Sequence, residues 1–305
     1  MAEKPETELV AQGYQVHSLY VGTFQADAIS KPHITARRLH AEGFSSGFLE
    51  EALEQVQYPL FGKWGLIGEK GGNDVYADRC SVYIFGQYYG RDGLDLKTRG
   101  LMVVSVLSVL LRENVLPTWT NACRNLGWSE DQLKELGALV SHVGGFPVSR
   151  GTLMLMDEVF EKRRKLTGEK AGSGALFETG QGLYLAAQDM AQRLFDNPYG
   201  DFDDLPLPEG DDFRKEMVTW VFGYLFVERN LIPLRAKVLA VIAMSTAIGR
   251  VAMVRRWIGG ARRIGCSRLE IQEAIITTAL YGGWPAAREA LGELTQSWPL
   301  QSLGD

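Results

Sequence analysis

Two stretches of this chain repeat each other at one fixed spacing, and no residue has to be inserted to align them. Arg112 returns as Arg250 and Trp119 returns as Trp257, so that the members of each pair are 138 positions apart. The same spacing joins Gly127 to Gly265, Gly144-Gly145 to Gly282-Gly283, Pro147 to Pro285 and Arg150 to Arg288. Chance rarely places tryptophan and glycine together at one offset, so the pattern predicts a duplicated structural unit.

The duplication divides the chain into two halves. A length of 305 residues suits two domains of roughly 100 to 200 residues each. We expect residues 1–170, the first half, to form one helical repeat with an N-terminal extension, and residues 171–305, the second half, to form the other repeat. The linker is expected around 163–174, where a run of charged residues is followed by glycine and serine.

Helix signals dominate both copies. The apolar runs Leu101–Leu111 and Val238–Ile248 are typical of buried core helices, and they are shorter than the stretch of about 20 apolar residues that crosses a bilayer. Asp95, Ser129 and Ser267 stand where helix N-caps are favoured. No strand pattern is strong enough to predict a sheet. The expected fold class is therefore all-α, with the two repeats packed as a pseudo-twofold pair.

Composition and charge narrow the range of partners. Hydrophobic residues make up 46% and charged residues 23% of the chain, which is ordinary for a globular protein. A formal net charge of -5 argues against nucleic acid and membrane as partners. The N-terminal stretch is acidic and polar and lacks the features of a secretory signal, so we expect a cytoplasmic protein.

The cysteines and acidic loops predict no metal site. Cys80, Cys123 and Cys266 lie far apart and form no C-x-x-C pair and no zinc-ligand spacing, so we expect reduced and mostly buried thiols. The acidic loop at 201–204 lacks the oxygen-ligand spacing of a calcium site, and we expect its carboxylates to be solvated. The sequence therefore predicts no bound metal.

Several motifs in the two copies are shared with a known family. The first copy contains GLDLKTRGLMVVSVLSVL and NLGWSEDQLKELGALVSHVGGFP, and the second contains a Gly-Cys-Ser turn and YGGWPAA. These motifs, within residues 85–160 and 222–295, resemble the carboxymuconolactone decarboxylase family, which includes the alkylhydroperoxidase branch. The resemblance implies an all-helical fold, symmetric homo-oligomers, a small-molecule pocket between units, and no cofactor.

The resemblance also implies which positions line the pocket. In the decarboxylase branch an Arg is followed three positions later by a Glu and four positions after that by a His, which transfers the proton. In the peroxidase branch the first two positions hold a C-x-x-C pair. The corresponding residues here are Arg112, Val115 and Trp119 in the first copy and Arg250, Met253 and Trp257 in the second. The acid and the histidine are replaced in both copies, and without a C-x-x-C pair thiol peroxidase activity is not expected.

The arginine and the tryptophan that both copies share point to binding rather than proton transfer. Tryptophan offers a flat apolar face and one N–H donor, and it does not exchange protons near neutral pH. A guanidinium can hold a carboxylate with two hydrogen bonds. We therefore predict Arg112 and Arg250 as anion clamps and Trp119 and Trp257 as pocket walls that bind the substrate. The alternatives are tryptophans that pack the core and arginines that are solvated or paired helix-end charges.

Two other residues are the candidates for catalytic proton transfer. His142 is the only histidine inside either copy, and histidine is the side chain whose charge changes near neutral pH. Tyr281 lies near the equivalent point of the second copy, where its phenol is better suited to donate a hydrogen bond than to act as a base. The alternative for His142 is a purely structural role on its helix.

Two hypotheses about function follow. The first is a cofactor-independent carboxymuconolactone decarboxylase-like enzyme that acts on a small oxygenated or carboxylated molecule, as a lyase, a decarboxylase or a related isomerase. The second is a catalytically silent relative that binds a small molecule or serves as a scaffold, because the family's acid and histidine are missing. Both predict an anionic small molecule and further copies of this chain as partners.

Overall fold

The structure, a computed structural model, describes residues 58–61, 84–85, 88–89, 91–173, 182–202, 204, 206–208 and 212–299. Regular structure within these ranges is helical throughout, so the all-α expectation is confirmed for them. Most of the N-terminal extension, part of the linker and Cys80 lie outside the described residues. Cys123 and Cys266 are buried free thiols, as expected, and burial raises the pKa of the Cys266 thiol to about 11.

Four consecutive helices in each half follow the repeated motifs. In the first half they are α7 (Leu96–Val109), α8 (Leu116–Asn125), α9 (Glu130–Gly144) and α10 (Phe146–Thr167). In the second half they are α13 (Leu234–Ala247), α14 (Val251–Arg263), α15 (Arg268–Gly282) and α16 (Trp284–Ser297). The helices α7, α9 and α10 each begin 138 residues before α13, α15 and α16, as Leu96 and Leu234 illustrate. The spacing of the sequence repeat is thus also the spacing of these helices.

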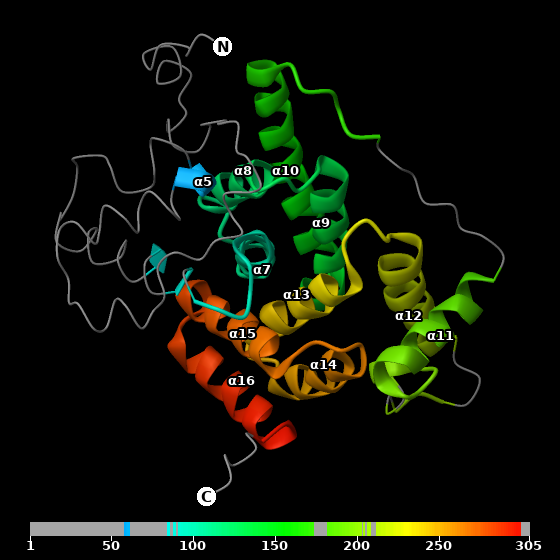
Figure 1. Cartoon of the computed structure of the whole chain (residues 1–305). Coiled ribbons are helices and arrows are strands. Elements are labelled where there is room, and N and C mark those ends of the chain that lie inside the picture. The colour runs from blue at the N-terminus through cyan, green and yellow to red at the C-terminus, as the bar shows by residue number, and fades with distance from the viewer. Residues whose placement is uncertain are drawn as a thin grey trace, which may run out of the picture.

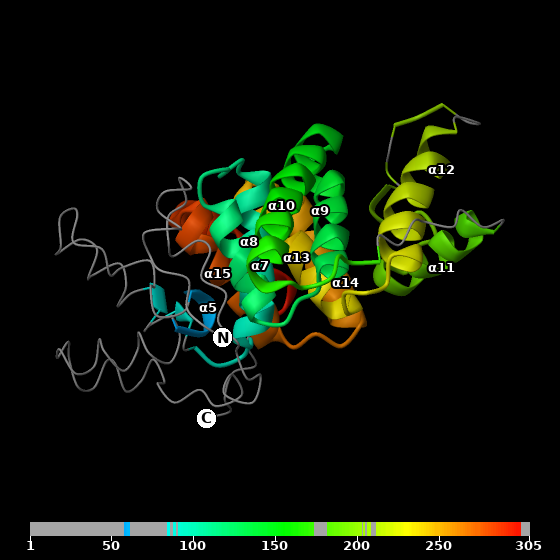
Figure 2. The same ribbon diagram turned by 90° about the horizontal axis from the view of Figure 1, so that it is seen from above.

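Further helices precede each series. They are α5 (Tyr58–Phe61) before the first series, and α11 (Leu183–Phe195), the 3₁₀ turn η5 (Gly200–Phe202), α12 (Phe213–Val218) and the π-helical η6 (Thr219–Glu228) before the second. The helix α5 packs on α8, and α11 packs on α14. Figures 1 and 2 show α11 and α12 together at one side of the molecule.

Local sequence signals explain where the main helices begin and end. The side chain of Asp95 accepts a hydrogen bond from the backbone N–H of Thr98 and caps α7. Ser129 and Ser267 form reciprocal capping boxes at the starts of α9 and α15, so all three predicted N-caps are confirmed. After α8 the chain passes through Gly127 at a φ of 82°, a left-handed conformation that favours glycine.

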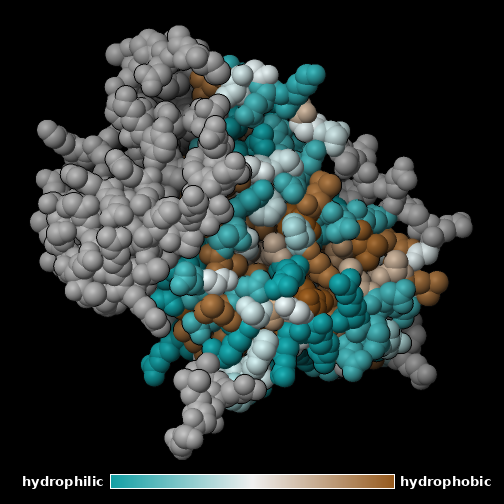
Figure 3. Space-filling view, in the orientation of Figure 1, coloured by the Kyte–Doolittle hydropathy of each residue, from teal (hydrophilic) through white to brown (hydrophobic). Residues whose placement is uncertain are grey.

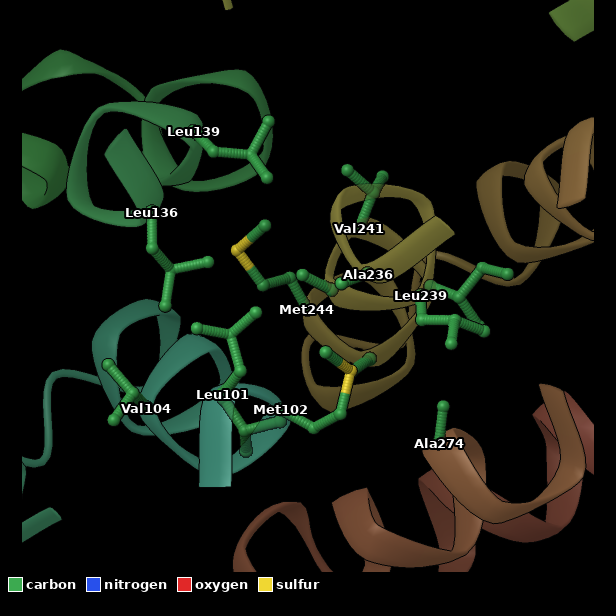
Figure 4. Packing of buried hydrophobic residues seen from close by; sticks show 14 of the residues in the cluster. Leu101, Met102, Val104, Leu136, Leu139, Ala236, Leu239, Val241, Met244 and Ala274 are labelled. Atoms are coloured by element: carbon green, nitrogen blue, oxygen red, sulfur yellow. The ribbon is translucent and has the colours of Figure 1, made fainter. Parts of the chain in front are cut away.

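The centre of the molecule is formed by α7 and α13, which pack against each other and against α9 and α15. Figure 4 shows apolar side chains of these four helices meeting, among them Leu101 of α7, Leu139 of α9, Met244 of α13 and Ala274 of α15. Because α7 and α13 are apolar on nearly all sides, they are buried on nearly all sides. The predicted core helices are confirmed, although the first ends at Val109. The two halves share one hydrophobic core.

Two buried ion pairs join the halves. Arg99 of α7 lies 2.9 Å from Glu273 of α15, and Lys237 of α13 lies 2.5 Å from Glu135 of α9. All four side chains are at most 1% exposed. The two basic residues occupy equivalent positions in the repeat, and so do the two acids. Each half therefore places its cation against the acid of the other half, a contact that the sequence pattern did not predict.

The described surface mixes polar and apolar side chains. On the face in Figure 3, hydrophilic residues predominate, with apolar patches between them. Phe146 and Trp284, which begin α10 and α16, are 62% and 59% exposed. Among the helices that the structure describes, none is long and apolar enough to cross a membrane.

Candidate functional site

Trp119 lies at the centre of an aromatic cluster on α8. Its side chain is fully buried. The ring of Phe61 meets the indole edge-on at 5.2 Å between centroids, Tyr89 stacks on it at 5.6 Å, and Tyr281 meets it edge-on at 5.8 Å. The indole Nε1 has no hydrogen-bond partner among the described residues. The cluster therefore combines apolar walls with one unused N–H donor.

Trp257 lies at the centre of a second cluster, on α14. Its side chain is also fully buried. Phe195 meets the indole edge-on at 5.1 Å, Phe226 lies tilted against it at 5.6 Å, and Phe222 stacks at 6.4 Å. The ring of His142 lies 5.4 Å from the indole. The structure thus brings together two predicted site residues, His142 and Trp257, from different halves of the chain.

The two clusters are built in the same way. Each tryptophan receives an edge-on phenylalanine from the end of a preceding helix, α5 or α11, and a stacked or tilted aromatic ring from the segment before its own series. Each also receives a residue from the last turn of the third helix of the other half, Tyr281 from α15 or His142 from α9. Both clusters therefore need residues of both halves.

Hydrogen bonds from equivalent positions hold those preceding helices. Asn125 Nδ2 donates to the carbonyl of Leu60 at 2.9 Å, and Arg263 Nη1 donates to the carbonyl of Leu194 at 3.2 Å. Asn125 and Arg263 are separated by the spacing of the repeat. The short helix α5 is therefore attached to α8 as α11 is attached to α14, and each attachment fixes the phenylalanine that follows the leucine.

The predicted arginine–tryptophan pairs are not in contact in this structure. Arg112 and Arg250 lie in the loops before α8 and α14 and are exposed, whereas both tryptophans are buried. No cation–π contact joins either described pair. Arg112 precedes the first residue of α8 by four positions, so it is not on the helix that carries Trp119, whereas Arg250 is the N-cap of α14 and its side chain is exposed. In the described part of the chain neither guanidinium has a hydrogen-bond partner. Their role as anion clamps stays a prediction.

His142 combines burial with an unused nitrogen. It lies in the last turn of α9, is half-buried as a whole, and has its Nε2 atom buried without a partner in the described part of the chain. Burial lowers the pKa of His142, and the negative charge of Asp201 partly offsets this by raising it. A neutral imidazole keeps one lone pair and one N–H, so it can accept a proton and return it.

Asp201 is a site residue that the sequence interpretation missed. Its Oδ2 accepts a hydrogen bond from Trp257 Nε1 at 3.1 Å, and its Oδ1 is buried without a partner among the described residues. The expectation that this carboxylate is solvated was wrong, because the turn η5 folds it against the aromatic rings around Trp257. The acidic loop carries no periodic signal that pairs it with a residue on α14, so nothing in the sequence reveals this contact.

Tyr281 forms a hydrogen bond with a tyrosine of the first half. Its hydroxyl lies 2.8 Å from that of Tyr89, close enough for one to donate to the other. Burial raises the pKa of both hydroxyls above the ordinary tyrosine value. Both phenols are therefore neutral near neutral pH, which suits hydrogen-bond donation better than action as a base.

Comparison with known proteins finds a family match within the second half. Residues 215–296 match the model described as the Carboxymuconolactone decarboxylase family. The chain is also 35% identical over 89 residues to a 4-carboxymuconolactone decarboxylase of Acinetobacter baylyi (strain ATCC 33305 / BD413 / ADP1), a match that spans 29% of this chain and 66% of that protein. The matched region contains Trp257 and Tyr281, whereas His142 and Asp201 precede it. Residues 215–296, with their all-helical fold, therefore support assignment to the carboxymuconolactone decarboxylase family.

Proposed function

We propose that this protein is a carboxymuconolactone decarboxylase-like lyase that acts on a small carboxylated molecule. The observation that carries the proposal is His142, whose buried Nε2 is unused in the described residues and whose ring packs on Trp257. Trp257 occupies the position where the family resemblance implies the proton-transferring histidine. His142 of the first half thus contacts Trp257, the residue that stands in the second half where the resemblance implies a histidine.

The proton step requires a donor next to the reacting carbon. When a carboxylate leaves as CO₂, the C–C bond breaks and its electron pair stays on the substrate carbon, which must then take a proton. The imidazolium form of His142 supplies this proton from Nε2 and becomes neutral imidazole. Asp201 favours the imidazolium by its negative charge. In a related isomerase reaction, His142 Nε2 would take a proton from one substrate carbon and return it to another.

The other predicted residues have binding roles in this proposal. Arg112 and Arg250 are exposed cations that attract an anionic substrate. Trp257 provides an apolar wall and holds Asp201 through its N–H. Tyr281 donates a hydrogen bond at the Trp119 cluster, because its hydroxyl remains protonated.

We further propose that the two halves are a tandem duplicate related by a pseudo-twofold axis. The equal spacing of three helix starts, the exchanged ion pairs and the matching tryptophan clusters support this arrangement. Residues 1–170 and 171–305 are then two repeats of one folding unit. We also propose that the protein forms homo-oligomers and is located in the cytoplasm.

The test is release of CO₂ from 4-carboxymuconolactone by the purified protein. We expect turnover by the natural chain and a loss of about a hundredfold or more in His142→Gln, because glutamine cannot carry the proton. His33→Gln makes the same chemical change outside both copies and should retain activity. If His142→Gln, with its helix content intact, turns over at the natural rate, His142 is not the proton donor. If the natural chain releases no CO₂ from this substrate or other small carboxylated lactones, the decarboxylase proposal fails.

A catalytically silent binding protein is the second candidate. It is favoured by the replacement of the family's acid and histidine in both copies, and by the full burial of Trp119 and Trp257. It predicts a small acid that remains bound through purification and is released unchanged. Native mass spectrometry of the fresh protein, followed by identification of the released molecule, separates this candidate from an enzyme that converts the acid.

A further inference from the structure

The two buried tryptophans differ in the hydrogen bonding of their indole N–H groups. Trp257 Nε1 donates to the carboxylate of Asp201, whereas Trp119 Nε1 is buried without an acceptor among the described residues. Leaving a buried N–H unpaired costs about 1–3 kcal/mol. The indole of Trp119 is fully buried, so bulk water does not offset this cost. The first cluster therefore has a buried N–H donor without the acceptor that Asp201 provides in the second.

A second donor lies in the same cluster. Tyr89 and Tyr281 both pack on the indole of Trp119, and their hydroxyls share one hydrogen bond of 2.8 Å. One hydroxyl proton is used in that bond, and the proton of the other hydroxyl remains available. Because burial raises the pKa of both phenols, both protons are retained near neutral pH. The cluster thus offers an indole N–H and a phenol O–H.

The chemistry of the two clusters is therefore opposite in kind. Around Trp257, the unused atoms are Asp201 Oδ1 and His142 Nε2, which accept or exchange protons. Around Trp119, the unused groups are donors, and their neighbours are aromatic rings. A ligand oxygen therefore meets hydrogen-bond donors at the Trp119 cluster.

From this contrast we infer that the Trp119 cluster is a second ligand site, separate from the proposed catalytic site. It binds the carboxylate or carbonyl oxygen of a small planar organic acid through Trp119 Nε1 and the Tyr89–Tyr281 hydroxyl pair. The aromatic rings hold the flat body of the ligand. No proton is transferred there, because a neutral indole and two neutral phenols are poor acids and bases at neutral pH. The inference goes beyond the proposed decarboxylase reaction and does not depend on turnover.

The test uses the ¹⁵N-labelled full chain and benzoate as a planar carboxylate probe. The seven tryptophans give separate indole N–H signals, and Trp119→Phe identifies the signal of Trp119. We expect benzoate to move this signal downfield in a saturable titration, because the N–H gains a charged acceptor. Benzylamine, which has the same ring and a cationic donor in place of the acceptor, should not move it.

Matched variants identify the donors. Trp119→Phe and Tyr281→Phe each keep an aromatic ring and remove one donor, and each should weaken benzoate binding about tenfold, the usual effect of a hydrogen bond to a charged group. Trp298→Phe and Tyr199→Phe make the same changes elsewhere and should leave the affinity unchanged. If Trp119→Phe does not fold, benzoate titrations of the natural chain and of Tyr281→Phe still test the inferred site.

Three results would overturn the inference. The first is no saturable shift of the Trp119 signal at millimolar benzoate. The second is a shift of the Trp257 signal in place of the Trp119 signal. The third is natural affinity in folded Trp119→Phe and Tyr281→Phe. Absence of CO₂ release would leave the inference intact, since it concerns the other cluster and the proposed reaction.

Discussion

At the scale of single residues, the most informative atoms are buried polar atoms without partners in the described residues. His142 Nε2 and Asp201 Oδ1 belong to the Trp257 cluster, and Trp119 Nε1 belongs to the other. Each unpaired group costs stability, about 1–3 kcal/mol, and burial among aromatic rings adds no compensating hydrogen bond. A ligand that forms a hydrogen bond to such a group offsets this cost. The proposed catalytic site and the proposed second ligand site therefore both contain such groups.

The electrostatic contact between Asp201 and His142 predicts the effect of removing the charge. The negative charge of Asp201 raises the pKa of His142, against the lowering by burial. Asp201→Asn keeps an acceptor for the indole of Trp257 and removes the charge, so the pKa of His142 should fall further below its ordinary value. NMR titration of the imidazole C–H signals measures this, since the chain has four histidines and His142→Gln identifies the signal. A pKa that stays the same or rises would show that Asp201 does not act on His142.

At the scale of elements, local signals specify the helices and long-range contacts specify the site. Ser129 and Gly127 could be assigned from the sequence because a cap or a left-handed turn depends on neighbouring residues. His142 could be nominated as a titratable residue, but its contact with Trp257 joins positions far apart in the chain. Asp201 could not be found, because a short turn in an acidic loop carries no periodicity that indicates its neighbours.

The equivalent caps predict equivalent losses of stability. Ser129 and Ser267 each accept a hydrogen bond from the backbone N–H three residues later, at 3.1 Å in both cases. Replacing either with alanine removes that acceptor and should lower the free energy of unfolding by about 1 kcal/mol. Threonine at the same positions retains the hydroxyl and should lose less. Urea unfolding of the four variants measures this, and alanine variants as stable as the natural chain would contradict the assigned caps.

At the scale of the whole molecule, the two halves share one core and exchange buried charges. α7 and α13 pack against each other, and each carries a basic residue that meets an acid on the third helix of the other half. Glu135 also accepts hydrogen bonds from the backbone N–H groups of Leu231 and Ile232. The repeat in the sequence predicted two similar units, but it did not predict which residues of one half contact the other half.

Breaking one exchanged ion pair should destabilise the whole chain. Lys237→Met leaves the buried carboxylate of Glu135 without its cation, and loss of one partner from a buried pair costs about 3–5 kcal/mol. Adding Glu135→Gln removes the unpaired charge and should restore part of the loss. Chemical unfolding that follows helix content gives both values. A change below about 1 kcal/mol in Lys237→Met would contradict a buried charge pair at this place.

In the proposed reaction, His142 of the first half donates the proton at the Trp257 cluster, with Asp201 beside it. The most direct test is the dependence of CO₂ release on pH in the natural chain and in Asp201→Asn. Only the imidazolium donates, so the rate should fall as pH rises through the pKa of His142. Because Asp201→Asn lowers that pKa, the fall should occur at lower pH in the variant, displaced by the change that NMR measures for His142. Identical pH profiles in the two proteins, despite a measured change in the pKa of His142, would show that His142 is not the proton donor.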